Sequence, residues 1–167
     1  MKPTIFLDLD GVMCTTHEYF QSVKNFWEKY EFARDIGMQY RFNPGCVKVL
    51  NQILKITDAD IVLTSDWRED YDLQTLDNIF KFNEVIKSPI DVTDVYSKTM
   101  QELEKFRASE INDYIYKKNI TNYVIIDDLD LSPFVPQNKF IRTINREGIK
   151  QSNIKEKILK TLRYEQK

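Results

Sequence analysis

Short runs of apolar residues alternate along this chain with longer segments in which apolar residues recur every three or four positions. The runs that begin at residues 5, 61 and 123 are typical of strands buried on both faces of a parallel sheet. The predicted strands cover residues 5–7, 61–65 and 123–128, with a fourth at 139–144 and a short one at 84–88.

The segments with helical spacing fall between these strands. Asn43 is the expected N-cap of a helix that has Pro44 at its first position, and Ser152 is the expected cap of a last helix. The predicted helices cover residues 18–33, 44–57, part of 73–82, 97–118 and a last segment with Ile154, Ile158 and Leu162 on one face.

Strands that alternate with helices imply crossover connections between parallel strands. We therefore expect an α/β fold, a three-layer α/β/α sandwich with a mostly parallel, Rossmann-like sheet and the first strand near its middle. The chain has 167 residues, a length that favours one domain over residues 1–167.

The composition is typical of a soluble globular protein, with 42% hydrophobic and 30% charged residues. No apolar run reaches the roughly 18 to 20 residues of a membrane span, so no membrane association is expected. Cys14 and Cys46 match no metal-ligand pattern and suggest reduced thiols in a cytoplasmic protein. The segment from Pro136 onward holds nine basic and three acidic residues, either a contact face for an anionic partner or a solvated terminal helix.

Polar side chains follow three of the predicted strands, in the pairs Asp8 and Asp10, Thr64 and Ser65, and Asp127 and Asp128. The carboxyl ends of parallel strands meet at one edge of a sheet, where such folds bind ligands. Residues two apart on a strand share a face, so Asp8 and Asp10 are expected to lie together and to repel each other. Oxygen ligands without His or Cys favour Mg²⁺ as the balancing cation.

A magnesium ion attracts phosphate, and a carboxylate beside it can attack phosphorus to form an aspartyl-phosphate. A second acid can donate a proton to the leaving oxygen and later accept one from water. Gly11 lets the chain turn sharply where a Cβ would crowd the phosphate. A hydroxyl and a basic residue complete the charge balance of phosphoryl transfer. The residues therefore predict a Mg²⁺-dependent phosphomonoester hydrolase.

The segments LDLDGV and IVLTS, a later basic residue, and VIIDD resemble, in this order, the four motifs of the haloacid dehalogenase-like (HAD) superfamily. The resemblance implies that Asp8 is the nucleophile and Asp10 the general acid/base. It also implies that the Asp8 carboxylate, the Asp10 backbone carbonyl and Asp127 ligate Mg²⁺, with Asp128 acting through water.

The same resemblance places the second-motif hydroxyl at Thr64, with the adjacent Ser65 as the alternative. It places the third-motif basic residue at Arg107, where superfamily members more often have Lys. The alternatives for this basic residue are Lys98 and Lys105, and the alternative role of Arg107 is a surface ion pair with Glu104 or Glu110.

A narrower resemblance links VLTSDWR, RASEINDYI, VIIDD and FIRTINREGI to the HAD-type domain of multidomain RNA-repair proteins and to polynucleotide-end phosphatase domains. It favours a nucleic-acid end or a nucleotide as substrate. A small-metabolite phosphatase, a non-catalytic phosphate-binding module and a receiver-type signalling domain are the alternatives. Gly11, Ser65 and Arg68 are the candidate substrate-binding residues. Trp67 and Arg68 can equally be structural, as a ring packed under the site and an ion pair with a nearby acid.

HAD enzymes commonly insert a cap domain after the first or second strand, but residues 13–43 hold only about one helix. We expect a small helical flap there and an open site that admits a bulky phosphorylated substrate. The aromatic residues of the flap either stack on bases or, as their helical spacing favours, pack in the core. No obligate protein partner is expected.

Overall fold

A five-stranded parallel sheet is the centre of the computed structural model, which describes residues 2–15, 42–96 and 102–162. The strands are β1 (Thr4–Leu7), β2 (Asp60–Leu63), β3 (Asp91–Val92), β4 (Tyr123–Asp127) and β5 (Phe140–Arg142). Their order is β3-β2-β1-β4-β5, and every neighbouring pair is parallel. The predicted α/β fold and the central place of the first strand are therefore confirmed.

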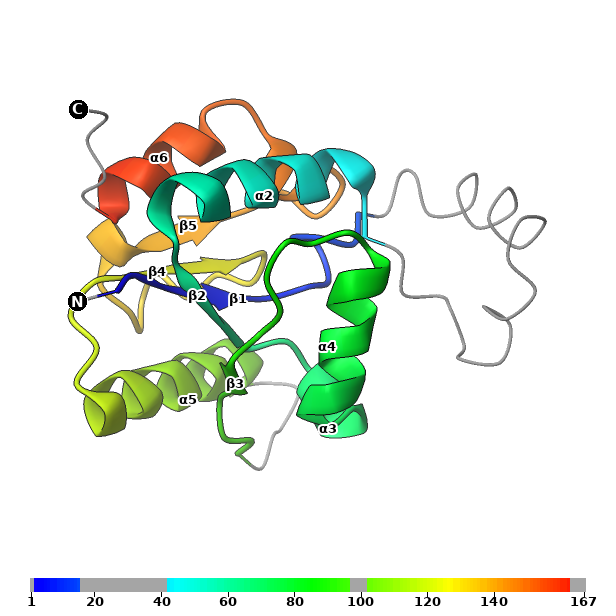
Figure 1. The fold of residues 1–167 in the computed structure, drawn as a ribbon. Helices are drawn as coiled ribbons and strands as arrows, with labels where there is room; N and C mark the ends of the chain where they lie inside the picture. Colours follow the sequence, from blue (N-terminus) through cyan, green and yellow to red (C-terminus); the bar gives the residue numbers. More distant parts are fainter. Residues whose placement is uncertain (1, 16–41, 97–101, 163–167) are drawn as a thin grey trace.

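Helices cover both faces of the sheet (Figure 1). On one face lie α2 (Pro44–Thr57) and α6 (Ile154–Thr161), and on the other lies α5 (Leu103–Lys118). The remaining elements are α3 (Trp67–Asp70), α4 (Leu73–Phe82) and two 3₁₀ turns, η3 (Gln137–Lys139) and η4 (Gly148–Lys150). The arrangement is the predicted three-layer sandwich.

The central strand β1 is buried on both faces. Ile5 and Leu7 belong to the core cluster that contains the apolar residues of α2 and α6. Phe6 points the other way and packs in a second cluster with Ala108 and Ile111 of α5. This alternation explains why β1 reads as a continuous apolar run, because neither of its faces reaches water.

Asn43 caps α2, as predicted: its side chain accepts hydrogen bonds from the backbone N–H groups of Gly45 and Cys46. The prediction of Ser152 as the cap of the last helix is wrong. Asn153 precedes α6 in a left-handed conformation (φ 66°) and makes no side-chain cap. The predicted apolar face of that helix is confirmed, because Ile154 and Ile158 are buried.

The predicted strand at 84–88 is also wrong, because this segment forms turns and the strand beside β2 is the two-residue β3. Glu84 adopts a left-handed conformation (φ 59°), which breaks an extended run. Only Val85 of the segment is buried, so its apolar character reflects one anchor residue after α4.

The predicted helix at 18–33 and most of the flap at 13–43 lie outside the described residues. The single-domain assignment over residues 1–167 stays a prediction. Within the described ranges, the structure contains no helix that combines the length and apolar character needed to cross a membrane.

Candidate active site

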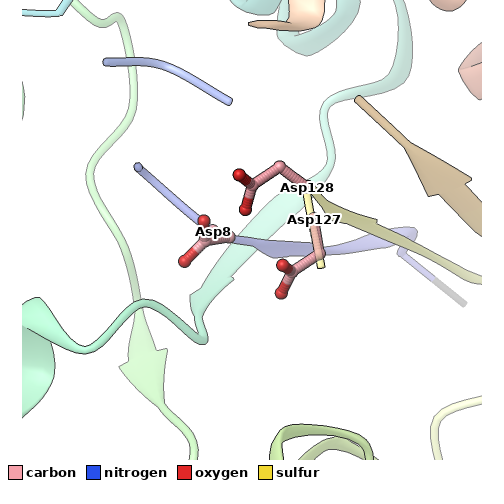
Figure 2. A group of neighbouring side chains, drawn as sticks. All are labelled: Asp8, Asp127 and Asp128. Carbon is pink, nitrogen blue, oxygen red and sulfur yellow. The ribbon is translucent and has the colours of Figure 1, made fainter. Parts of the chain in front are cut away.

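Three carboxylates converge at the carboxyl edge of the sheet (Figure 2). Asp8 directly follows β1, Asp127 is the last residue of the neighbouring β4, and Asp128 comes next. One carboxylate oxygen from each lies within 4.8 Å of the other two. Asp8 and Asp127 are both buried, so their negative charges have little water to screen them.

Arg107 brings a positive charge to this cluster from α5, the helix on the face of the sheet opposite α2 and α6. Its Nη1 donates to Asp8 Oδ1 and to Asp127 Oδ2, both at 3.0 Å, and its Nη2 donates to Asp66 Oδ1 at 2.6 Å. Its side chain is only 3% exposed, so Arg107 is not a surface residue.

The alternatives to Arg107 find no support in the described part of the chain. Lys105 is exposed and pairs with Glu102, while Lys98 lies outside the described residues. Arg107 forms no ion pair with Glu104 or Glu110 among the pairs of the described residues.

Asp10 is not one of the three converging carboxylates, but its negative charge contributes to the raised pKa of Asp8, as expected of neighbouring acids. The expectation that the two side chains share a face stays a prediction. β1 ends at Leu7, so the two-residue period of a strand does not extend to Asp10. The Asp10 side chain accepts a hydrogen bond from Trp67 Nε1 at 2.9 Å. Trp67 is nearly buried against Phe42, with ring centroids 6.1 Å apart, and therefore holds this carboxylate in a fixed direction.

Gly11 follows in a left-handed conformation (φ 74°) that favours glycine. A Cβ at this position would lie 2.3 Å from Asp128 Oδ2, so only glycine lets the loop approach this carboxylate. The Gly11 carbonyl accepts a hydrogen bond from the Thr143 hydroxyl at 2.9 Å, which ties the loop after β1 to the end of β5. The predicted sharp exit from the strand is thus present, and it makes room for Asp128.

Thr64 and Ser65 follow β2 and are both buried. Neither hydroxyl oxygen has a hydrogen-bond partner within the part of the chain that the structure describes. The next residue, Asp66, occupies the N-cap position of α3, but its side chain makes no capping hydrogen bond to this helix. A buried hydroxyl without a partner is costly, and a ligand oxygen would satisfy it. The choice between Thr64 and Ser65 stays open.

The role of Arg68 as a substrate-binding residue stays a prediction, and the contacts of its guanidinium in the structure are with the protein itself. Its side chain is fully buried and pairs with the equally buried Glu110. The same guanidinium donates to the carbonyl oxygens of Thr64 and Thr93. Glu110 accepts a second hydrogen bond from the backbone N–H of Tyr96 at 2.8 Å. These contacts agree with the structural alternative for Arg68, an ion pair with a nearby acid.

A comparison of the sequence with protein-family models identifies a family for the chain. The family model described as "HAD domain in Swiss Army Knife RNA repair proteins" matches residues 4–154. The chain belongs to this family. Among curated proteins and among solved structures, the corresponding comparisons found no match to this chain. Membership indicates a phosphatase-type function for this HAD domain and confirms the resemblance carried by its motifs.

In the HAD domain, burial disfavours the ionised forms of Asp8 and Asp127. Burial, together with the charge of Asp127, holds the pKa of Asp8 well above its ordinary value of 3.8, although Arg107 opposes this. Burial also raises the pKa of Asp127 to about 6, again against Arg107. The pKa of Asp10 is raised by burial, while its hydrogen bond from Trp67 works in the opposite direction.

The donor set of the HAD domain fits Mg²⁺. All three converging groups offer carboxylate oxygens, the ligands that hard cations prefer, and a bound cation would offset the burial and like-charge repulsion that raise the pKa values of Asp8 and Asp127. Asp8, Asp127 and Asp128 would hold the ion. Cys14 is no competing ligand, because burial raises the pKa of its thiol and disfavours the thiolate.

The melting temperature of the chelated protein is expected to fall between about pH 5 and pH 8. Asp127 and Asp8 have raised pKa values, so the folded state binds more protons than the unfolded state, and the stability present at low pH is lost as pH rises through the folded pKa. Mg²⁺ binds the ionised carboxylates and should raise the melting temperature more at pH 8 than at pH 5.

Differential scanning fluorimetry in EDTA and in MgCl₂ measures both effects. Carboxyl groups with lowered pKa values, such as Asp72 and Asp77, titrate below this window and do not mask the trend. The variant Asp127→Asn is the control and should flatten the pH dependence in EDTA. A flat wild-type profile with equal magnesium shifts at both pH values would contradict the expectation.

Some contacts of the site were not foreseen. Asp66, within VLTSDWR, accepts from Arg107, and Asn145, within FIRTINREGI, donates to Asp128 Oδ2 at 3.1 Å. Both residues lie in segments that carry the narrower family resemblance, which was the only signal available for them. Their partners are distant in the sequence, so no local pattern could identify them.

Proposed function

We propose that the protein is a Mg²⁺-dependent phosphomonoester hydrolase that works through an aspartyl-phosphate on Asp8. The observation that carries this proposal is the set of three carboxylates within 4.8 Å, with Arg107 donating to two of them. Acidic clusters are common on protein surfaces. Burying carboxylates and a bridging guanidinium costs folding free energy, and such groups are therefore concentrated at functional sites.

In the proposed first step, an Asp8 oxygen attacks phosphorus and the bond from phosphorus to the leaving oxygen breaks. Asp10 donates a proton to that oxygen, and the hydrogen bond from Trp67 fixes its carboxyl group for this role. In the second step, water attacks phosphorus and gives a proton to Asp10. The acyl-phosphate bond then breaks to release inorganic phosphate and the free Asp8 carboxylate.

The other residues balance the charge of the transferring phosphoryl group. Thr64 or Ser65 donates its hydroxyl to a phosphoryl oxygen, and Arg107 keeps the Asp8 carboxylate oriented. When bound, Mg²⁺ neutralises the negative charge of the phosphate and of the carboxylates. Asp8, Asp127 and Asp128 would hold the ion, and the backbone carbonyl of Asp10 would be a further ligand.

A phosphorylated nucleic-acid end or a nucleotide is the proposed substrate, supported by the RNA-repair proteins named in the family description. A small-metabolite phosphatase and a non-catalytic phosphate-binding module are the competing functions. The fixed position of Asp10 favours catalysis over binding alone, because phosphate binding needs no second acid. A receiver-type domain has its acidic pair early in the chain, whereas here Asp127 and Asp128 come late.

Phosphate release from a panel of phosphorylated compounds tests the proposal. The panel contains acetyl phosphate, sugar phosphates, mononucleotides, and oligonucleotides with a 5′- or a 3′-phosphate, each with MgCl₂ or with EDTA. We expect magnesium-dependent release that is fastest with a nucleotide or an oligonucleotide. Release that persists in EDTA would contradict the metal requirement, and phosphate binding without any release would favour the non-catalytic module.

A further inference from the structure

An open pocket of about 480 Å³ lies directly beside the candidate active site, where β4 and β5 end. It is lined by Asp128, Arg142, Thr143, Ile144 and Asn145. Asp128 also belongs to the three converging carboxylates, so the pocket and the candidate site share a wall. The volume is in the range of sites that bind small organic ligands and far exceeds what one phosphate group needs.

Arg142 lines this pocket with a guanidinium that is fixed by neighbouring residues and still accessible to solvent. Its Nε donates to the Asp128 carbonyl oxygen at 2.9 Å, and its Nη1 lies 3.1 Å from Asp130 Oδ2. About half of the side chain (54%) nevertheless remains exposed. A guanidinium that is fixed along its edge and open to solvent is suited to stack on a flat ring.

Ile144 and Asn145 add an apolar and an amide surface to the same pocket. Ile144 is 50% exposed, although its backbone N–H is fixed by a hydrogen bond to Gln151 Oε1 at 2.8 Å. Asn145 is exposed and donates one N–H to Asp128, which leaves further amide hydrogen-bonding capacity facing the pocket region. A planar cation, an aliphatic side chain and an amide are the groups that bind the face and the edge of a nucleobase.

The charge of the lining argues against a second phosphate as the occupant. Among the described residues that line the pocket, Arg142 is the only cation, and it lies against the carboxylate of Asp130 and beside Asp128. The positive charge is therefore already compensated, and another anion would gain little. A neutral, ring-containing group fits the pocket better than a polyanion does.

We propose that this pocket binds the nucleoside that carries the scissile phosphate, and that it makes the domain select nucleotides over other phosphate esters. The proposal rests on the proposed phosphatase function, because Asp128 would then lie between the bound nucleoside and the reacting phosphate. The nucleoside can come from a free mononucleotide or from the end of an oligonucleotide, which present the same chemistry to Arg142 and Ile144.

The test compares wild type with Arg142→Ala and Ile144→Ser. Arg146→Ala is the matched control, because Arg146 is exposed in the same segment but does not line the pocket. The kcat/KM is measured with acetyl phosphate, which has no ring, with a mononucleotide and with a phosphorylated oligonucleotide. Circular dichroism checks the fold, and two independent pocket variants keep the test decisive if one does not fold.

Each pocket variant is expected to lower kcat/KM for nucleotide substrates about tenfold, mainly through KM, the size typical of losing one base-stacking contact. Hydrolysis of acetyl phosphate and all activities of Arg146→Ala should stay within about twofold of wild type. A loss for the oligonucleotide alone would identify nucleic-acid ends as the source of the nucleoside, and an equal loss for the mononucleotide would identify free nucleotides as sufficient.

Two results would contradict nucleoside binding in this pocket while leaving the phosphatase function intact. One is equal losses on acetyl phosphate and nucleotides, and the other is a wild-type preference for sugar phosphates. If wild type hydrolyses no ester at all, the phosphatase function fails separately. In that case, calorimetry with a nucleoside monophosphate tests whether the pocket binds a nucleoside. Weaker binding to Arg142→Ala than to Arg146→Ala would support it, and equal binding would overturn it.

Discussion

Replacing Asp8 by Asn is expected to abolish phosphate release, lowering kcat by about four orders of magnitude or more. The amide keeps the size of the carboxylate but cannot attack phosphorus, so no acyl-phosphate forms. The substitution also removes one charge from a buried cluster in which Asp127 raises the pKa of Asp8. The melting temperature in EDTA should therefore not fall, which separates lost chemistry from lost folding.

The measurement is phosphate release from the best ester of the panel, with Asp70→Asn as the control. Asp70 is exposed on α3 and undergoes the same chemical change away from the three carboxylates. Its activity should match wild type. Activity in Asp8→Asn within a factor of ten of wild type would mean that the nucleophile is another residue.

Replacing Glu110 by Gln is expected to lower the free energy of unfolding by about 3–5 kcal/mol, the typical cost of breaking a buried ion pair. Glu110 and Arg68 are both fully buried, and no other carboxylate of the described residues lies as close to the guanidinium. The amide leaves the charge of Arg68 without its main counterion, in a place where water cannot compensate for it. Urea unfolding measures the difference.

The matched control is Asp94→Asn, which breaks the ion pair between Asp94 and Lys117. Both side chains of that pair are more than half exposed, so the expected loss is below about 1 kcal/mol. Similar losses for the two variants would mean that burial of the pair between Arg68 and Glu110 carries no special weight. A large loss for Glu110→Gln alone would support its role in fixing α5, the helix that carries Arg107.

Much of the fold follows from local patterns, because each central strand is buried on both faces and therefore leaves a continuous apolar run. The run at residues 5–7 and its counterpart at 123–126 correspond to β1 and β4, and Asn43 with Pro44 correctly predicts the start of α2. The short β3 leaves no such signal, because it has only two residues and both are partly exposed.

The candidate site was predictable only as a set of residue types. The acids after β1 and β4 converge because parallel neighbours deliver their carboxyl ends to one edge, a consequence of topology that motif order reveals. The direction of Asp10 and the burial of Arg68 depend on partners far along the chain, Trp67 for one and Glu110 for the other. A sequence read alone does not fix such pairings.

The central position of β1 also has a consequence for synthesis on the ribosome. Thr4 pairs with Asp60 on one side and with Tyr123 on the other, so the strand made first waits longest for its second neighbour. Until β4 emerges, one edge of a largely apolar strand stays unpaired, which favours association with other nascent chains. If the proposed phosphatase function holds, the same delay means that a partly made chain has no activity, since Asp127 and Asp128 arrive with β4.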